Sequence, residues 1–395
     1  MPSRFGLSGW SSSGDGSVGD GRRNAGIDLL RGLSILLVVL HHIGLRIRLR
    51  QTELIDFLPL KLLNALNFNG YEAVFIFFVI SGFLITSNAL RRSGSLANID
   101  LRAFYARRFS RIAPCLLLLV AVLSALHLLG VQDYVIERQG QSLPRAIVAA
   151  LGFHLNWYEG MTGYLPGGWD VLWSLSIEEV FYLGFPIVCL LTRRTWVLAP
   201  MLITLAISLP WTRAALADND IWQEKAYLPG MAAIATGVLG ALLAQRWKTV
   251  PRGVASALGV AGATGLYLVM FEGKLLWQTM HNGYMLLLTA SALCLVLASY
   301  WAPAGRAPWR GLGWLRSWGR LSYEIYLTHM FVVTAIVRLY KAMGSDLAHG
   351  YLWYLPALPL CWLLGKAVER YISVPAEQRL RARMLPMPVA SAVPA

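Results

Sequence analysis

The chain has little charge for its length. Only 14% of its 395 residues are Asp, Glu, Lys or Arg, whereas soluble proteins carry about 25%. The mean hydropathy is +0.52, and the apolar residues come in long runs separated by short basic or polar joints. This composition excludes an ordinary soluble domain and is typical of a polytopic membrane protein.

Cysteine and histidine are too sparse and too scattered to predict a metal site. The four cysteines lie in or beside apolar runs without C-x-x-C spacing, and we interpret them as small buried residues. The seven histidines show no metal-binding spacing. We therefore expect no metal cofactor.

Acidic residues are outnumbered, with 21 Asp and Glu against 35 Lys and Arg and a formal net charge of +14. In a soluble protein this excess would suggest nucleic acid. Here the basic residues cluster at the ends of apolar runs, so membrane topology explains them and we expect no nucleic-acid partner. Placing the N-terminus in the cytoplasm puts most basic residues inside, which predicts that both termini are cytoplasmic.

Apolar runs near 20 residues long match the ~30 Å hydrocarbon core of a bilayer, and they are too long for barrel strands. The predicted fold class is therefore an all-α polytopic membrane protein with about ten transmembrane helices in a single domain. The stretch 144–160 is apolar but short, and we interpret it as a possible extra re-entrant or interfacial helix. The predicted spans cover residues 28–46, 71–90, 112–130, 169–191, 196–213, 228–245, 253–271, 282–300, 321–341 and 351–366.

The two ends of the chain differ in composition from the apolar middle. The first 24 residues are rich in Ser and Gly and lack the apolar core of a signal peptide. The domain prediction is a disordered cytoplasmic tail at 1–24, a membrane-embedded domain at 25–380 and a short C-terminal tail at 381–395. We find no internal repeat of the kind that many transporters show.

Several ionisable residues fall inside the predicted spans, where each costs about 2.5–3.5 kcal/mol on insertion scales. In the first span, Arg31 and His42 are separated by three helical turns and share one face, with a rise of about 16 Å between them. His41 points about 100° away from that face. Asp28 precedes Arg31 by three residues and can pair with it. The alternative is that Arg31 is a topological anchor and His42 a hydrogen-bonded packing residue.

Two other spans carry polar clusters. In WSLSIEEVFYL, residues 173–183, Glu178 and Glu179 point about 100° apart, so we expect one to face a cavity and the other a structural partner. In LSYEIYLTHM, residues 321–330, Ser322, Tyr326 and His329 share one helical face. Structural hydrogen bonding explains this last cluster as well as function does.

A basic segment, FYARRFSRIAP, covers residues 104–114. It places Arg107, Arg108 and Arg111 just before the predicted third span, with Pro114 expected in the first turn of that helix. Arginines at the start of a helix suit phosphate groups, through bidentate hydrogen bonds and the helix dipole. Contact with anionic lipid headgroups is the alternative.

Taken in order, these stretches resemble the type-3 family of membrane-integral acyltransferases. The resemblance rests on D-x-L-R-G with a following histidine (28–42), FFVISGFLIT (77–86), FYARRFSRIAP, WSLSIEEVFYL, LSYEIYLTH and a weak E-R-x-x-x-x-P echo at 369–375. It covers about 28 to 380. The chain departs from the family at Phe75, where many members have an acidic residue that Glu72 could replace, and at Val180, where many have Gln. Some members of the family carry an additional extracytoplasmic domain, and we expect no such domain in this chain.

The resemblance implies a reaction and a set of site residues. An acyl group, usually acetyl, would pass from cytoplasmic acetyl-CoA or another acyl-CoA to a hydroxyl of a cell-envelope glycan, such as a lipopolysaccharide O-antigen or an exopolysaccharide. The implied location is a bacterial inner membrane. By this resemblance the catalytic set is His42, Arg31, Glu178 and Glu179, the donor-binding set is Arg107, Arg108, Arg111 and Tyr105, and the substrate-binding set is Asp28, Ser81, Tyr323 and His329.

The chemistry of His42 has two forms that the sequence does not separate. It could take the proton from the acceptor hydroxyl as a general base, or it could carry the acyl group as an acyl-histidine. The competing functional hypothesis is a membrane transporter, or an acyl-group translocator without transfer chemistry of its own. The acceptor, the acyl chain, the oligomeric state and any partner protein stay open.

Overall fold

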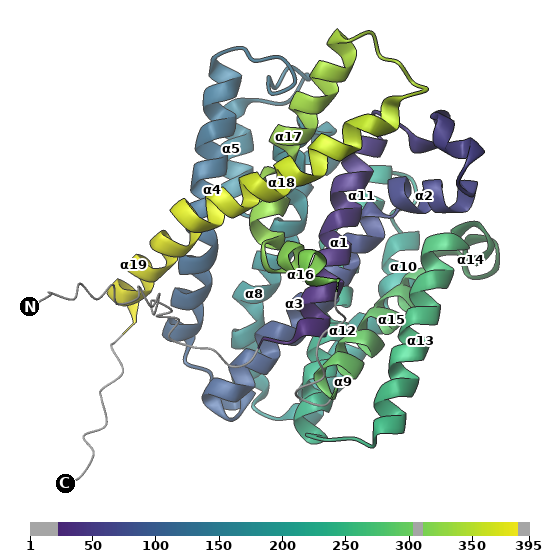
Figure 1. The fold of residues 1–395 in the computed structure, drawn as a ribbon. Helices are drawn as coiled ribbons and strands as arrows, with labels where there is room; N and C mark the ends of the chain where they lie inside the picture. Colours follow the sequence, from purple (N-terminus) through teal and green to yellow (C-terminus); the bar gives the residue numbers. More distant parts are fainter. Residues whose placement is uncertain (1–22, 303–310, 386–395) are drawn as a thin grey trace, which may run out of the picture.

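The computed structural model describes residues 23–302 and 311–385, which form a bundle of α-helices without strands (Figure 1). Residues 1–22 of the tail predicted at 1–24 lie outside the described residues, as do 303–310 and 386–395. The all-α membrane fold is confirmed. In the described part, eight helical segments are long and apolar enough to cross a bilayer: Ala25–Gly44, Gly70–Ser93, Leu101–Leu128, Gly167–Thr192, Asp220–Arg246, Arg252–Phe271, Gly273–Tyr300 and Ser322–Ala342.

These segments correspond to eight of the ten predicted spans. They contain α1 (Ala25–Gly44), α3 (Gly70–Ser93), α4 (Leu101–Leu128), α7 (Gly167–Asp170) with α8 (Leu172–Thr192), α11 (Asp220–Lys225) with α12 (Tyr227–Arg246), α13 (Arg252–Phe271), α14 (Gly273–Met280) with α15 (Tyr284–Tyr300), and α17 (Ser322–Ala342). The predicted spans 196–213 and 351–366 are shorter helices: α9 (Thr195–Ile207) with α10 (Leu209–Ala214), and α18 (Tyr354–Val368).

The stretch 144–160 folds as two short helices, α5 (Leu143–Leu151) and α6 (Leu155–Thr162), neither of which has the length of a span. Three further short helices complete the fold: α2 (Leu60–Phe68), α16 (Gly313–Arg320) and α19 (Val374–Met384). A π-helical segment, Glu369–Ser373, joins α18 to α19. Helix α19 therefore continues four residues beyond the predicted domain end at 380.

Helix α4 corrects one local prediction. We expected a helix beginning near residue 112 with Pro114 in its first turn, but α4 begins at Leu101 and holds Pro114 in its interior. Asp100 sets the earlier start because its side chain accepts a hydrogen bond from the Ala103 N–H, as N-cap residues do. The arginines of this segment consequently lie in the second and third turns of a long helix rather than before a span.

Small residues let the central helices approach closely. A Cβ atom on Gly82 of α3 would lie 2.0 Å from the Ile234 carbonyl oxygen of α12, and one on Gly237 would lie 2.0 Å from that of Val79. Such contacts hold membrane helices together by backbone packing. Close packing at a glycine also holds α16 against α1, because a Cβ on Gly32 would lie 1.9 Å from the Leu315 carbonyl oxygen. This contact explains why glycine follows Arg31.

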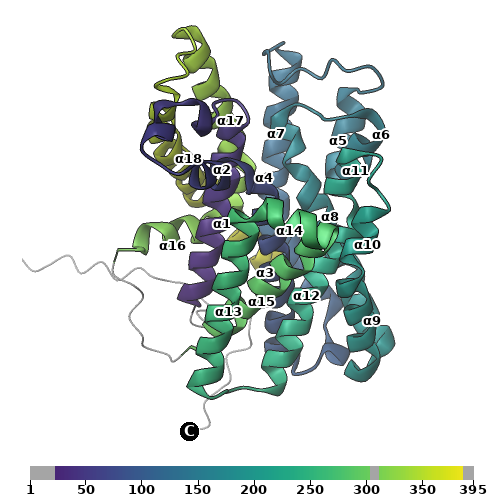
Figure 2. The ribbon, with the colours of Figure 1, turned by 90° about the vertical axis from the view of Figure 1, so that its right-hand side faces the viewer.

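The long helices run along the bundle in two opposite directions. Helices α1, α4 and α13 begin at its lower end in Figure 1, and α3, α8 and α12 run the other way. Figure 2 shows α16 lying across the bundle, so that α17 begins part of the way up rather than at the lower end. The start of α17 therefore places polar side chains beside the middle of α1.

Candidate active site

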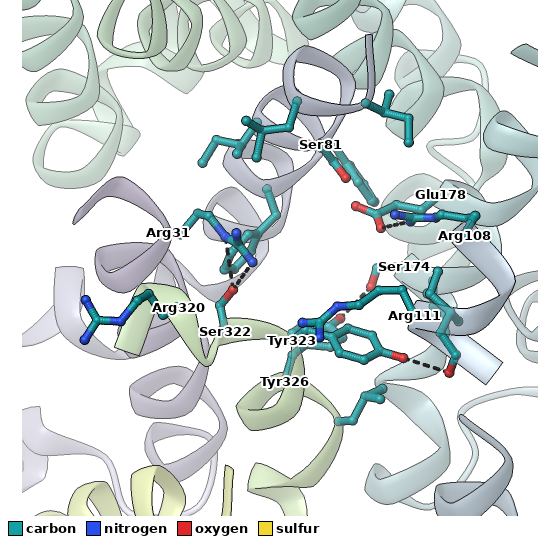
Figure 3. Close-up of a pocket in the computed structure, with 18 of the residues that line it drawn as sticks. Arg31, Ser81, Arg108, Arg111, Ser174, Glu178, Arg320, Ser322, Tyr323 and Tyr326 are labelled. Carbon is teal, nitrogen blue, oxygen red and sulfur yellow. Dashed lines mark hydrogen bonds and ion pairs between the residues drawn. The ribbon is translucent and has the colours of Figure 1, made fainter. Parts of the chain in front are cut away.

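A polar cavity of about 430 Å³ lies between α1, α3, α4, α8, α17 and α19. Figure 3 shows arginines entering it from different helices, with serine and tyrosine hydroxyls between them. Six of the residues predicted from sequence line it: Arg31, Ser81, Arg108, Arg111, Glu178 and Tyr323. Segments that are distant in the sequence thus build one basic chamber.

Arg108 is held on three sides. Its guanidinium lies 2.7 Å from Glu179 Oε1 and 3.4 Å from Glu178 Oε2. It also sits over the Tyr182 ring, 4.1 Å from the ring centroid, where a cation–π attraction adds to the ion pairs. Tyr182 in turn donates a hydrogen bond to Ser81 Oγ at 2.5 Å. The two glutamates divide as expected, because Glu178 lines the cavity and the buried Glu179 holds Arg108.

Arg111, one turn later, joins α4 to the C-terminal helices. It lies 3.0 Å from the fully buried Glu324 of α17 and 3.3 Å from Glu377 of α19. Ser373 Oγ bridges these groups, accepting from Arg111 at 3.2 Å and donating to Glu324 at 2.7 Å. The Arg111 guanidinium also lies over the Tyr323 ring, 5.0 Å from its centroid. A buried charge needs such partners, and these fix the far wall of the cavity.

Arg31 differs from the other two arginines in having no carboxylate within ion-pair distance in the described part of the chain. Its guanidinium donates to Ser322 Oγ at 2.8 Å and 3.2 Å. Asp28, which was expected to pair with it, is buried and does not line the cavity. The charge of Arg31 is therefore available to an anionic ligand.

His42 lies on the same helix as Arg31 but outside the cavity lining, and it pairs with His329 of α17. His329 Nε2 is 3.3 Å from His42 Nδ1, and the ring centroids are 4.9 Å apart. His42 Nδ1 is also 2.8 Å from the Val38 carbonyl oxygen. Because a carbonyl oxygen can only accept, we assign the proton of neutral His42 to Nδ1, which leaves its Nε2 as a free base.

His329 has the complementary hydrogen-bond arrangement. Its Nδ1 lies 3.1 Å and 2.8 Å from the carbonyl oxygens of Ile325 and Tyr326, so we assign its proton to that nitrogen. The Nε2 lone pair then faces His42 Nδ1–H. His329 is fully buried. It therefore contributes to the ring orientation of His42, whose tautomer is set by the Val38 carbonyl oxygen.

Tyr326 connects the cavity lining to the histidine pair. Tyr326 and Ser174 both line the cavity, and their hydroxyls are 2.7 Å apart. The Tyr326 ring centroid lies 6.0 Å from that of His329. Tyr326 thus belongs to the cavity lining and neighbours His329, which in turn contacts His42.

Three other predicted site residues lie away from the cavity lining. Tyr105 donates a hydrogen bond to the Leu183 carbonyl oxygen at 2.6 Å, Arg107 points to another face of α4 and Asp28 packs beside α16. His41 packs at the junction of α2 and α3, with Nδ1 2.8 Å from the Asn67 carbonyl oxygen. His41 and His42 thus face different neighbours, as their helical phase predicts.

Sequence reasoning assigned no site role to several lining residues. Arg320 had been explained by membrane topology, and Glu377 and Arg381 belong to a helix not predicted as part of the site. The available sequence signal for such lining residues was helical phase, which places Ser322 and Tyr326 on the same face as His329. No group of three His, Cys, Asp or Glu side chains within residues 23–302 and 311–385 is placed to hold a metal ion.

Comparison with known proteins adds the family. Over 382 residues the chain is 24% identical to the O-acetyltransferase OatA of Staphylococcus aureus, covering 90% of this chain and 57% of that protein. A putative O-acetyltransferase of S. aureus strain COL is 29% identical over 171 residues, covering 41% of this chain and 24% of that protein. The chain thus spans little more than half the length of the first relative. No solved structure matches it.

The family match covers most of the membrane domain. Residues 24–366 match the acyltransferase domain that defines the type-3 group. The matched region contains α1, α3, α4, α8 and α17, which supply most of the cavity lining and both histidines of the pair. Because this match extends over well more than half of the chain, the protein belongs to the type-3 family of membrane acyltransferases.

Proposed function

We propose that this chain is an O-acyltransferase that moves an acyl group, acetyl by family precedent, from cytoplasmic acyl-CoA to a hydroxyl of a cell-envelope glycan. The observation that carries the proposal is the basic cavity beside a histidine pair. The cavity contains Arg31, Arg108 and Arg111, which suit the phosphates of CoA. The histidine pair supplies a base whose tautomer is fixed by its neighbours.

The donor enters from the lower end of the bundle in this proposal. Arg23 and Arg381, close to the two ends of the described chain, both line the cavity. The two ends of the described chain therefore lie beside the same cavity, and the basic residues favour the cytoplasm for that side. Rise along α1 from Arg31 to His42 is about 16 Å. An extended pantetheine arm can span such a distance with its phosphates still among the arginines.

His42 Nε2 takes the proton of the acceptor hydroxyl as its oxygen attacks the thioester carbon. The carbon–oxygen bond forms, the carbon–sulfur bond breaks, and CoA leaves as a thiolate that recovers a proton. The Nδ1–H of His42 is shared between the Val38 carbonyl oxygen, at 2.8 Å, and His329 Nε2, at 3.3 Å, and both acceptors stabilise the imidazolium that forms. If Nε2 instead attacks the thioester, an acyl-histidine carries the group before the hydroxyl receives it. Both sequences use the same nitrogen.

The position of the reaction suits its chemistry. In this proposal the pantetheine arm passes the hydrogen-bonded Tyr326 and Ser174 on its way to the histidine pair and fills the path that water would take. Exclusion of water protects the thioester from hydrolysis. The proposed location is the inner membrane of a bacterium, and the proposed acceptor is an O-antigen, an exopolysaccharide or a related glycan.

The test uses membranes that contain the protein, radiolabelled acetyl-CoA and the envelope glycan of the source organism. Wild type, His42→Ala and His41→Ala are compared at matched expression. We expect alkali-labile label on the glycan with wild type and His41→Ala, and none with His42→Ala. Equal labelling by wild type and His42→Ala would overturn the catalytic assignment, and transport of acetyl groups without glycan labelling would favour a translocator.

A further inference from the structure

A second cavity, of about 810 Å³, lies between α2, α3, α13, α14 and α15. It shares no lining residue with the arginine cavity. Figure 2 shows α2 and α14 near one another beside the upper part of α13. The lining combines aromatic, amide and charged side chains, among them Asn64, Phe68, Glu72, Trp277 and Tyr284.

Two polar atoms of this lining are buried and without a partner in the described part of the chain. They are Glu72 Oε2 and Asn64 Oδ1. The other carboxylate oxygen of Glu72 accepts a hydrogen bond from Tyr284 at 3.3 Å, and Arg213 donates to that tyrosine at 3.2 Å. Glu72 is therefore fixed in place with one oxygen unsatisfied. Buried oxygens of this kind call for hydrogen-bond donors from a ligand.

The remaining lining suits one class of ligand. Phe68, Phe271 and Trp277 offer aromatic surface of the kind that packs on the C–H face of a sugar ring. Hydroxyl groups are the donors that a carboxylate and an amide oxygen accept. The lining carries three basic residues, Arg50, Lys61 and Lys274, and two acidic ones, Glu72 and Glu272, and Lys61 pairs with Glu272 at 2.5 Å. This charge excess favours an anionic substituent on the bound molecule.

The cavity adjoins the proposed catalytic helix on the side of His41. The His41 ring packs against Gly70, and its Nδ1 contacts the Asn67 carbonyl oxygen. Asn69 and Glu72, from the same turn, line the cavity. A chain of sugars anchored here would therefore run toward α1. The His41 ring packs against Gly70 of this turn and its centroid lies 5.4 Å from that of His42, so the cavity holds a neighbouring sugar rather than the reacting hydroxyl.

We propose that this second cavity is a subsite for the acceptor glycan, binding a hydroxyl-bearing sugar with an anionic substituent through Glu72, Asn64 and Trp277. The assignment rests on the proposed function for its role, but its occupancy can be measured separately. It also accounts for the two adjacent histidines, because His41 then separates the subsite from the catalytic nitrogen of His42.

Direct occupancy is tested by photolabelling in phosphatidylcholine nanodiscs, which avoid sugar-based detergents. The probe is a set of oligosaccharides released from the envelope of the source organism and tagged at the reducing end with a diazirine. We expect labelled peptides from α2 and α14 by mass spectrometry, and loss of label with excess untagged oligosaccharide. Labelling elsewhere, or no competed labelling of these helices, overturns the subsite. Loss of label on addition of phosphatidylglycerol instead assigns the cavity to a lipid headgroup.

Kinetics provide the second readout. Glu72→Gln and Trp277→Ala are expected to raise the acceptor KM about tenfold, as loss of a charged hydrogen bond or a packing surface does. The matched controls are Glu137→Gln and Trp196→Ala, which are exposed and lie outside both cavities. Thermal stabilisation by CoA reports that each variant is folded with a working donor site.

The two proposals fail in different ways. If wild type transfers no acetyl group, the proposed function fails whatever the photolabelling shows. If wild type transfers acetyl and the Glu72 and Trp277 variants keep the acceptor KM of their controls, the subsite is wrong and the acyltransferase proposal stands.

Discussion

His329 Nε2 lies 3.3 Å from His42 Nδ1, so the two helices that carry these residues share one hydrogen-bonded imidazole pair. Only one of the four ring nitrogens, His42 Nε2, is left as a base without a hydrogen-bond partner among the described residues. In this arrangement His42 supplies the nitrogen for the chemistry, and the neighbouring His329 ring orients it.

This relationship predicts different results at the two positions. His42→Ala should abolish transfer, whereas His329→Ala should lower kcat about 100-fold, within the range of positioned acid–base effects. His329→Gln, whose amide oxygen can accept the Nδ1–H bond, should recover part of that loss. The measurement is kcat with saturating acetyl-CoA and glycan. A His329→Ala enzyme with unchanged kcat would contradict the positioning role.

Arg31 on α1 and Arg107 on α4 allow donor binding in the cavity to be distinguished from a general effect of positive charge. Arg31→Ala should lower kcat/KM for acetyl-CoA at least tenfold, because its guanidinium faces the cavity without a carboxylate partner. Arg107→Ala should change it less than twofold, since Arg107 does not line the cavity. Thermal stabilisation by CoA provides the binding readout. Equal losses in both variants would show that general positive charge, not this chamber, recruits the donor.

A buried ion cluster predicts a large loss of stability. The Lys225 ammonium lies 2.9 Å from Glu159 Oε2, pairs with Asp170 and sits 4.3 Å from the Tyr164 ring centroid. Lys225→Met leaves these carboxylates unpaired and should lower the free energy of unfolding by about 3–5 kcal/mol. Reversible unfolding in mixed micelles measures this.

The control is Lys341→Met on the exposed end of α17, which should stay within about 0.5 kcal/mol of wild type. Adding Glu159→Gln and Asp170→Asn to Lys225→Met should recover stability, because no uncompensated charge then remains. If Lys225→Met is as stable as Lys341→Met, the cluster contributes nothing to the fold.

Close helix packing predicts opposite effects at two glycines. Gly237→Ala places a methyl group 2.0 Å from the Val79 carbonyl oxygen, so α3 and α12 must separate. We expect a loss of about 1–3 kcal/mol. Gly184→Ala, with nothing within 4 Å of its Cβ, should instead raise stability by about 0.5–1 kcal/mol through helix propensity. The same unfolding assay compares them, and similar values for both would refute the close contact.

Sequence patterns predicted the helical spans because hydropathy and length follow directly from the bilayer. Helical phase also placed Arg31 with His42 on one face and separated Glu178 from Glu179. It did not say which partner each face would meet. The contact of Arg108 with Glu179 joins positions 71 residues apart, and such pairing depends on how α4 and α8 pack.

The remaining misses have similar causes. Pro114 was placed at a helix start because proline favours that position, but the Asp100 cap and the apolar packing of α4 extend the helix past it. Arg320 had a sufficient explanation in topology, and only the crossing orientation of α16 shows that it lines the cavity. Local preference gives each helix its length, and tertiary contact selects the residues of the site.

The separation of the two cavities has a consequence for the membrane as an electrical barrier. A single polar cavity running through the bundle would offer ions a continuous conduit and would dissipate the membrane potential. Here the two cavities share no lining residue. Dividing the polar groups between separate cavities lets the chain bring them into a bilayer without joining them in one conduit.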